Sequence, residues 1–275
     1  MNDDRCEMFV YLLIDNGLLQ EVSAGYTEAD VKSRPEWLEP IYSERALEVS
    51  PLLVDIESAY EEGALDQVMG YLNACKPALH VSIIETSLDF KQIAQHLRRF
   101  TFILDSAGKQ FTLRYADCAV LAILPSILNP EQWAAMSSPI TKWNICNRSG
   151  LIVRLPLIHF TSSVPTPICL EQDQLDALEE SSEPDHFVAK VRMMHHGADF
   201  PGSAADQYTW ACTARQIWRA ANNSNELCLT FLTEAAIFTR GNIFSGQAIQ
   251  EFLAIEKAGI FRERLQELVR QMSSI

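Results

Sequence analysis

The sequence predicts an α/β fold of the α+β kind: a mixed α/β lobe over residues 1–168 and an all-helical lobe over residues 169–275. Two observations carry this prediction. The first half alternates short β-branched and aromatic runs with segments whose apolar residues recur at helical spacing, whereas the second half shows helical spacing alone. A polar run with two prolines, 162–167, lies between the halves and is typical of a linker.

Short apolar runs that end at turn residues predict the first strands. Met8 to Asp15 is one such run and closes at Asn16-Gly17. Two further strands are predicted over 51–56 and 78–85. Apolar residues spaced three and four apart predict helices over 64–75 and 88–99, and the polar segment 27–36, interrupted by Pro35, predicts a surface loop.

The middle of the chain predicts two hairpins around a helical stretch. Residues 100–104 and 110–115 flank an Asp/Ser/Gly-rich link, and 141–146 and 151–160 flank Asn147-Arg148-Ser149-Gly150. Between them an apolar helix is predicted over 118–128. Asn129 then caps a further helix, with Pro130 at its first position.

Helices are predicted throughout the last third. A Ser-Ser-Glu-Pro break at 181–184 separates the first two of them. The predicted helices span 170–180, 184–196, 203–222, 225–240, 246–258 and 259–272.

Charge and composition argue against several classes of partner. The net charge is −14, and residues 1–66 hold 16 Asp and Glu against 4 Lys and Arg. This balance disfavours nucleic acid and anionic membranes, which both need a basic surface. No apolar run is long enough for a membrane helix, and the start is acidic where a secretory signal would be basic. We therefore expect a cytoplasmic protein.

No pattern of catalytic or metal-binding residues stands out. The seven cysteines are odd in number and show no C-x-x-C spacing, so free thiols in a reducing compartment are expected. His195 and His196 are neighbours and would point about 100° apart on a helix, which disfavours a shared metal. Gly108-Lys109 lacks the glycine loop of a phosphate site. We expect no enzyme activity, no metal and no cofactor.

The segment from His96 to Asn144 is more distinctive. It contains a His-Leu-Arg-Arg-Phe run, an Arg-Tyr-Ala-Asp step, a Leu-Pro pair, a glutamine and a Ser-Pro-Ile turn before a tryptophan. These are 96–100, 114–117, 124–125, Gln132 and 138–140 with Trp143. This segment resembles the adaptor family that loads toxic effectors onto the spike of the bacterial type VI secretion system. Residues 11–17 and 51–56 are similar to the family's opening strands, so the resemblance spans most of the chain.

The resemblance implies a non-catalytic chaperone that binds a cognate effector (a toxin protein) and delivers it to the spike protein. The chain departs from the family pattern after Asp117, where Cys118-Ala119 replaces the usual Pro-Arg pair. At the motif itself, Arg114, Tyr115 and Asp117 predict a structural turn. Asp117 is placed to cap the next helix, and Arg114 to bond to Asp117 or to nearby carbonyls.

Tryptophans supply the candidate partner contacts, because exposed aromatic residues often anchor interfaces. Trp37, in a polar loop, is predicted to be exposed, and Trp143 is the second candidate. Trp210 and Trp218 lie eight residues apart on one helix face, so at least one should be in the core.

Two alternatives remain open at this point. One is an immunity-type inhibitor, whose acidic first third would fill a basic toxin cleft. The other is an enzyme with an unrecognised site, since catalytic groups can be assembled from distant residues.

Overall fold

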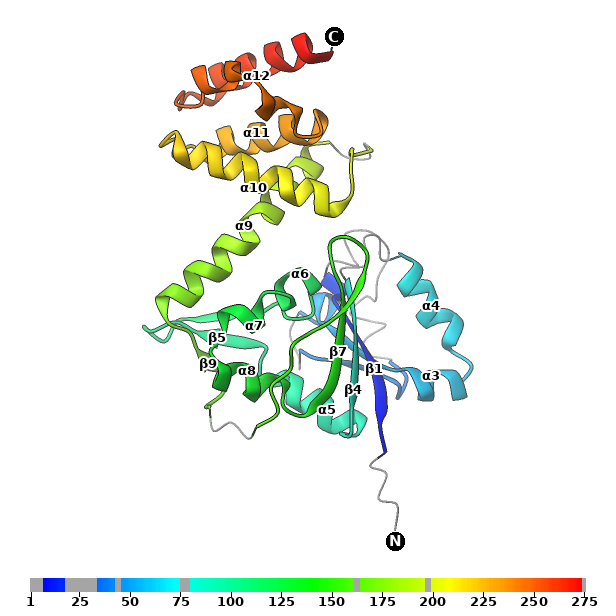
Figure 1. Cartoon of the computed structure of the whole chain (residues 1–275). Helices are drawn as coiled ribbons and strands as arrows, with labels where there is room; N and C mark the ends of the chain where they lie inside the picture. Colours follow the sequence, from blue (N-terminus) through cyan, green and yellow to red (C-terminus); the bar gives the residue numbers. More distant parts are fainter. Residues whose placement is uncertain are drawn as a thin grey trace. The chain divides into compact units, whose positions relative to one another are not determined.

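The computed structural model describes residues 7–17, 34–42, 46–74, 80–160, 164–195 and 199–273. The chain divides into two compact units, residues 1–179 and 180–275 (Figure 1). The first combines sheets and helices and the second is helical, so the predicted fold class is confirmed.

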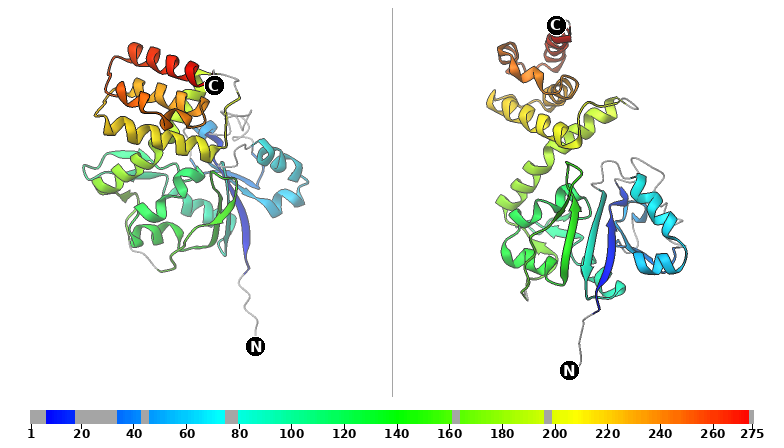
Figure 2. Two further views of the ribbon diagram at one scale, coloured as in Figure 1. Left: turned by 45° about the horizontal axis from the view of Figure 1, so that its top comes forward. Right: turned by 45° about the vertical axis from the view of Figure 1, so that its right-hand side comes forward.

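A six-stranded antiparallel sheet forms the centre of the first unit, in the order β2-β3-β1-β4-β7-β8. Its strands are β1 Phe9–Ile14, β2 Leu38–Pro40, β3 Leu52–Asp55, β4 Val81–Thr86, β7 Ile140–Cys146 and β8 Ile152–Arg154. The right-hand view of Figure 2 shows β1, β4 and β7 side by side.

Both faces are buried at the centre of this sheet, as β1 demonstrates. Tyr11 and Leu13 face one core, and Leu12 and Ile14 face the other, because successive side chains of a strand point to opposite faces. Helices α5 Phe90–Arg98, α6 Cys118–Leu121, α7 Leu124–Ile127 and α8 Pro130–Ser137 contribute to the first core. Helices α3 Ile56–Glu61 and α4 Leu65–Ala74 contribute to the second.

A small sheet, in the order β6-β5-β9, completes the first unit. The predicted hairpin forms from β5 Phe102–Leu104 and β6 Gln110–Thr112, and β9 Ile168–Cys169 pairs in parallel with β5. This pairing explains why the division between the units lies after Glu179 and not at residue 168. The predicted linker leads back into the first unit, although its residues 162 and 163 lie outside the described residues.

The second unit contains most of α9 Gln172–Met194, with α10 Ala204–Ala220, α11 Glu226–Phe238 and α12 Ala258–Ser273. Their apolar faces meet in one core that includes Phe187, Trp218, Leu232 and Phe261. Short 3-10 turns, η3 Asn242–Ser245 and η4 Gln247–Glu251, connect α11 to α12. Another 3-10 turn, η1 Leu47–Val49, precedes β3 in the first unit.

Two differences from the prediction occur at prolines. The single helix expected over 118–128 is divided into α6 and α7, because Pro125 has no N–H to continue the helical hydrogen bonds. The break expected at Pro184 does not occur, and α9 runs through it. Side chains of α10 contact α9 beside Pro184. The Tyr208 hydroxyl donates to Ser181 O at 3.2 Å, and Arg215 pairs with Glu183.

The helix predicted over 246–258 is also wrong. Only η4 forms, because side-chain amides bind the carbonyls beyond it. Asn223 Nδ2 donates to Leu253 O at 2.8 Å and to Ile255 O at 3.0 Å, and Asn225 Nδ2 donates to Glu256 O at 2.7 Å. These carbonyls are thus bound by side chains that lie 30 to 32 residues earlier in the sequence.

Candidate protein-interaction site

The motif turn around Asp117 has the predicted form. The Asp117 carboxylate accepts a hydrogen bond from the Ala119 N–H at 2.9 Å and thereby caps α6. Arg114 pairs with Asp15, 3.1 Å from Nη2 to Oδ2, which the sequence did not indicate. The turn therefore joins β6, α6 and the end of β1.

Asp15 lies in a buried polar cluster at the end of β1. Its side chain is only 4% exposed, whereas that of Arg114 is 49% exposed. The Asp15 N–H donates to His80 O at 2.8 Å. Burial lowers the pKa of His80, and burial together with the negative charge of Asp15 raises the pKa of Tyr42. The cluster thus surrounds the Asp15 carboxylate, and the half-exposed Arg114 guanidinium connects it to the surface.

The other distinctive motif residues also make internal contacts. The Tyr115 hydroxyl is buried and donates to Leu97 O at 2.9 Å, and burial raises the pKa of Tyr115. His96 Nε2 lies 2.8 Å from Met136 O, and Gln132 Nε2 donates to Cys169 O at 2.9 Å. These residues hold α5, α8 and β9 to one another. These three motif residues therefore form part of the scaffold of the first unit.

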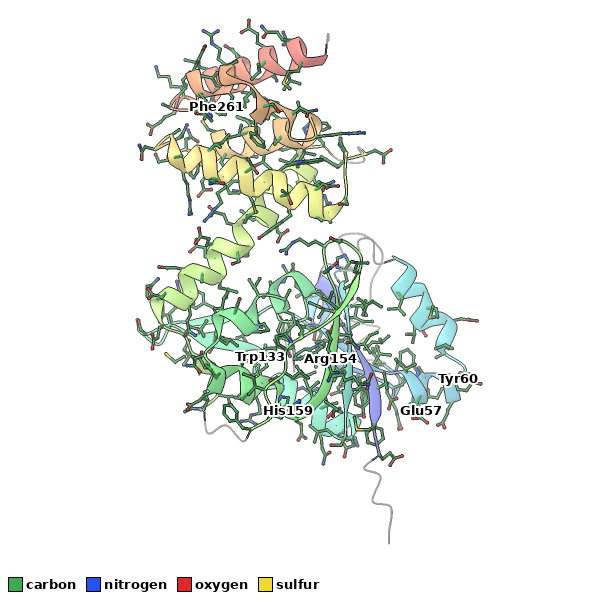
Figure 3. The ribbon with its side chains drawn as sticks, in the orientation of Figure 1. Glu57, Tyr60, Trp133, Arg154, His159 and Phe261 are labelled. Atoms are coloured by element: carbon green, nitrogen blue, oxygen red, sulfur yellow. The ribbon has the colours of Figure 1, made fainter. Side chains whose placement is uncertain are left out.

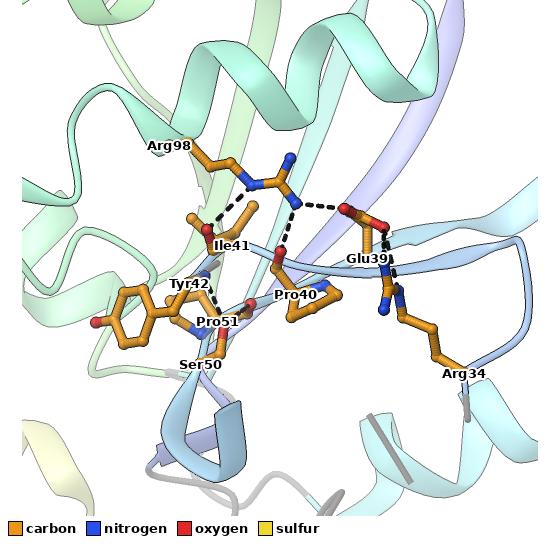
Figure 4. A network of polar contacts seen from close by, with 8 residues as sticks. All are labelled: Arg34, Glu39, Pro40, Ile41, Tyr42, Ser50, Pro51 and Arg98. Carbon is orange, nitrogen blue, oxygen red and sulfur yellow. Dashed lines mark hydrogen bonds and ion pairs between the residues drawn. The ribbon is translucent and has the colours of Figure 1, made fainter. Parts of the chain in front are cut away.

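Arg98 has a similar role beside β2 (Figure 4). Its guanidinium donates to Pro40 O at 2.8 Å and to Ile41 O at 3.2 Å, and it pairs with Glu39, which also binds Arg34. Ser50 Oγ accepts from the Tyr42 N–H nearby. Arg98 thus fixes the backbone at one end of the six-stranded sheet.

The prediction that Trp37 is exposed is wrong, because it is 2% exposed and packs in the core beside β2. Trp143 is fully buried; it donates to Ser82 Oγ at 3.0 Å and stacks on Trp133 (labelled in Figure 3). Binding a partner requires an accessible ring, so the structure does not support a partner-binding role for Trp37 or Trp143. The expectation for the other pair is confirmed, because Trp218 is in the second core and Trp210 packs against it.

Within the described residues, no group of three or more His, Cys, Asp or Glu is placed to hold a metal ion. The same part of the chain contains no helix long and apolar enough to span a membrane. Burial lowers the pKa values of His96 and His80, and both residues lie inside the first unit.

A hollow of about 420 Å³ lies between α11 and α12 in the second unit. Phe231, Phe238 and Leu265 are among its lining residues, and His195 Nε2 lies 2.6 Å from Glu234 Oε1 at its side. The sequence assigned His195 only to a helix end. Its pairing with Glu234, 39 residues away, had no signal in the local pattern.

Among the residues that the structure describes, the most exposed run of consecutive apolar side chains is on the β7–β8 hairpin of the first unit. Leu151, Ile152 and Val153 are 62%, 69% and 36% exposed. Arg154, labelled in Figure 3, ends β8. The sequence predicted a strand here but not its exposure. No local signal marked the exposure, because a short run of consecutive apolar residues after a turn is typical of a strand buried on both faces.

Residues 10–135 match a family model described as "Domain of unknown function (DUF4123)". The match covers a little under half of the chain and includes Asp15, Arg114, Tyr115 and Asp117. No curated protein and no solved structure matches the chain.

Proposed function

We propose that this protein is an adaptor, or effector chaperone, that binds a cognate type VI secretion effector and helps load it onto the spike protein. One observation carries the proposal. The matched residues 10–135 contain most of the distinctive segment that resembles the adaptor family, and the matched domain is associated with adaptors of type VI secretion effectors.

The contacts of the motif residues support this proposal. Tyr115, His96 and Gln132 each bind backbone carbonyls of distant segments, so the resemblance concerns the internal scaffold of the first unit. A shared scaffold is expected of proteins that share a fold, whereas each adaptor's own surface would select its cargo.

The two-unit architecture is also compatible with the role. Each unit has its own apolar core, so the chain offers surfaces on two separately packed bodies. A protein that holds an effector and a spike needs two binding surfaces. Recognition would be non-covalent, in the bacterial cytoplasm, with apolar effector surface shielded until loading.

The direct experiment is affinity capture of the tagged protein from its own host, with bound proteins identified by mass spectrometry. The proposal predicts that a spike protein and an effector are recovered together. Recovery of a toxin domain without the spike would replace the adaptor with the immunity-type inhibitor. Recovery of neither would contradict both.

A further inference from the structure

The two edges of the six-stranded sheet differ in a way that bears on partner binding. In an antiparallel pair, residues alternate between those that bond to the neighbouring strand and those whose N–H and C=O point away from it. On β2 the Asp55 N–H donates to Trp37 O and the Ile41 N–H donates to Pro51 O. Alternation therefore directs the backbone groups of Leu38 and Pro40 outward.

Three of the four outward backbone groups of the β2 edge are closed to a further strand. The Leu38 N–H donates to Pro35 O at 3.2 Å, and Pro40 has no N–H. Pro40 O accepts from Arg98, as Figure 4 shows. Proline and bound carbonyls are devices by which proteins prevent a further strand from pairing at an edge.

Among the described residues, neither device is seen at the outward positions of the opposite edge, β8. The Asn147 N–H donates to Leu151 O and the Leu155 N–H donates to Trp143 O, both at 2.9 Å, so alternation directs the N–H and C=O of Ile152 and Arg154 outward. Among the strands that the structure describes, β8 is the last of its sheet. It therefore presents backbone donors and acceptors beside exposed apolar side chains.

The charges around β8 indicate the chemistry of its partner. Residues 132–170 contain no Asp or Glu, although the whole chain has a net charge of −14. Arg148 and Arg154 flank the apolar residues 151–153. Arg154 donates to Thr141 O, a neutral carbonyl, whereas Lys142 on β7 is paired with Glu85. The edge is thus locally basic at its ends and apolar in its centre.

We propose that β8 is a docking edge that accepts an extended segment of a partner protein, with an apolar centre and acidic residues at its ends. The partner's backbone would pair with the outward groups of Ile152 and Arg154, and its carboxylates would lie beside the arginines. Such strand addition derives affinity from main-chain hydrogen bonds and specificity from side chains. This inference rests on the proposed adaptor function, for which it names a partner-binding surface.

The test uses the full chain and a nine-residue peptide of alternating valine and threonine with glutamate at both ends. Binding is followed by NMR through the backbone amides of Ile152 and Arg154. We expect saturable shifts at these amides. In Ile152→Pro, where binding is followed through the Arg154 amide, we also expect at least tenfold weaker binding, because the substitution removes an outward N–H and leaves the bonds to β7 in place.

The matched control is Thr112→Pro. Thr112 lies on β6, the exposed edge of the other sheet, and its N–H also points outward because the Leu113 N–H bonds to Thr101 O. This variant should bind like the wild type. Loss of binding in Thr112→Pro, with none in Ile152→Pro, would place the site on β6 and overturn the proposal.

Charge reversal gives a second test that does not depend on the proline variant folding. Arg154→Glu should weaken the glutamate-ended peptide about tenfold and favour a lysine-ended peptide by a similar factor. Equal binding of both peptides to the wild type would contradict the proposed partner. The proposal would also be contradicted if the peptide did not shift the Ile152 and Arg154 amide signals, or if β8 paired with a second copy of the chain instead. Recovery of spike and effector by Ile152→Pro as well as by the wild type would reject this edge while leaving the adaptor function intact.

Discussion

Arg114 and Asp15 form an ion pair of 3.1 Å between residues that lie 99 positions apart in the sequence. The pair links the motif turn before α6 to the end of β1. One partner is buried and the other is half exposed, so the guanidinium compensates a carboxylate that solvent barely reaches. The residues that resemble the adaptor family are thereby connected to the first strand of the central sheet.

Removal of Arg114 should destabilise the first unit. Arg114→Ala withdraws the positive charge from a buried carboxylate, which is costly, but the exposure of Arg114 reduces the effect to about 1–2 kcal/mol. Urea unfolding followed by tryptophan fluorescence measures it. A double-mutant cycle with Asp15→Asn should give a coupling of about 1 kcal/mol.

Arg154→Ala, which removes an exposed arginine, is the control and should change stability by less than about 0.5 kcal/mol. Zero coupling would show that the pair has no energetic role.

Tyr115→Phe should lower stability by about 0.5–1.5 kcal/mol, because it removes the buried hydrogen bond from the Tyr115 hydroxyl to Leu97 O. Tyr60→Phe is the matched control: Tyr60 is 69% exposed on α3 (Figure 3), and its hydroxyl can bond to water in either state. Thermal unfolding of both variants makes the comparison. Equal melting temperatures for the two variants would contradict the assigned role of Tyr115.

Acidification should destabilise the protein through His96. Burial lowers its pKa in the folded state, while its bond to Met136 O acts in the opposite direction. The unfolded chain therefore takes up a proton first as the pH falls below about 6.5, and stability decreases. The loss should approach about 1.4 kcal/mol per pH unit. His96→Gln keeps a donor for Met136 O and should have a shallower pH dependence between pH 6.5 and 5. An unchanged slope in this variant would argue against a buried neutral histidine.

The cysteines should differ in reactivity. Burial raises the pKa of Cys118 to about 12, whereas Cys169 is exposed. Because the thiolate is the reactive form, only a very small fraction of Cys118 would be in the reactive form at pH 8. Iodoacetamide with peptide mass spectrometry should therefore label Cys169 at least tenfold faster in the native protein. The difference should vanish in urea, and fast native labelling of Cys118 would contradict its burial.

Local patterns predicted the elements whose signals are themselves local. The Asp105–Lys109 hairpin link, the Asn129 cap and the capping role of Asp117 depend on residues a few positions apart, and all three form. The α+β class follows from the same periodicities. Pro184 was read as a helix break because its local effect is strong, yet contacts from α10 override it.

Features that depend on distant contacts could not be predicted. Trp37 occurs in a polar stretch, and its burial depends on β2 pairing with β3, a pairing that no periodicity indicates. One carboxylate, Asp117, lies near Arg114 in the sequence, so the pairing of Arg114 with the distant Asp15 is visible only once the sheet has formed. The exposure of Ile152 likewise depends on β8 lying at the end of the sheet.

The central claim is that this protein places an effector on the spike. The most direct measurement captures the tagged spike from host cells with and without this protein and quantifies the bound effector by mass spectrometry. The adaptor function predicts that the effector is present on the spike only when this protein is present, and that restoring the wild-type chain restores it. Equal amounts of effector on the spike in both strains would contradict the claim.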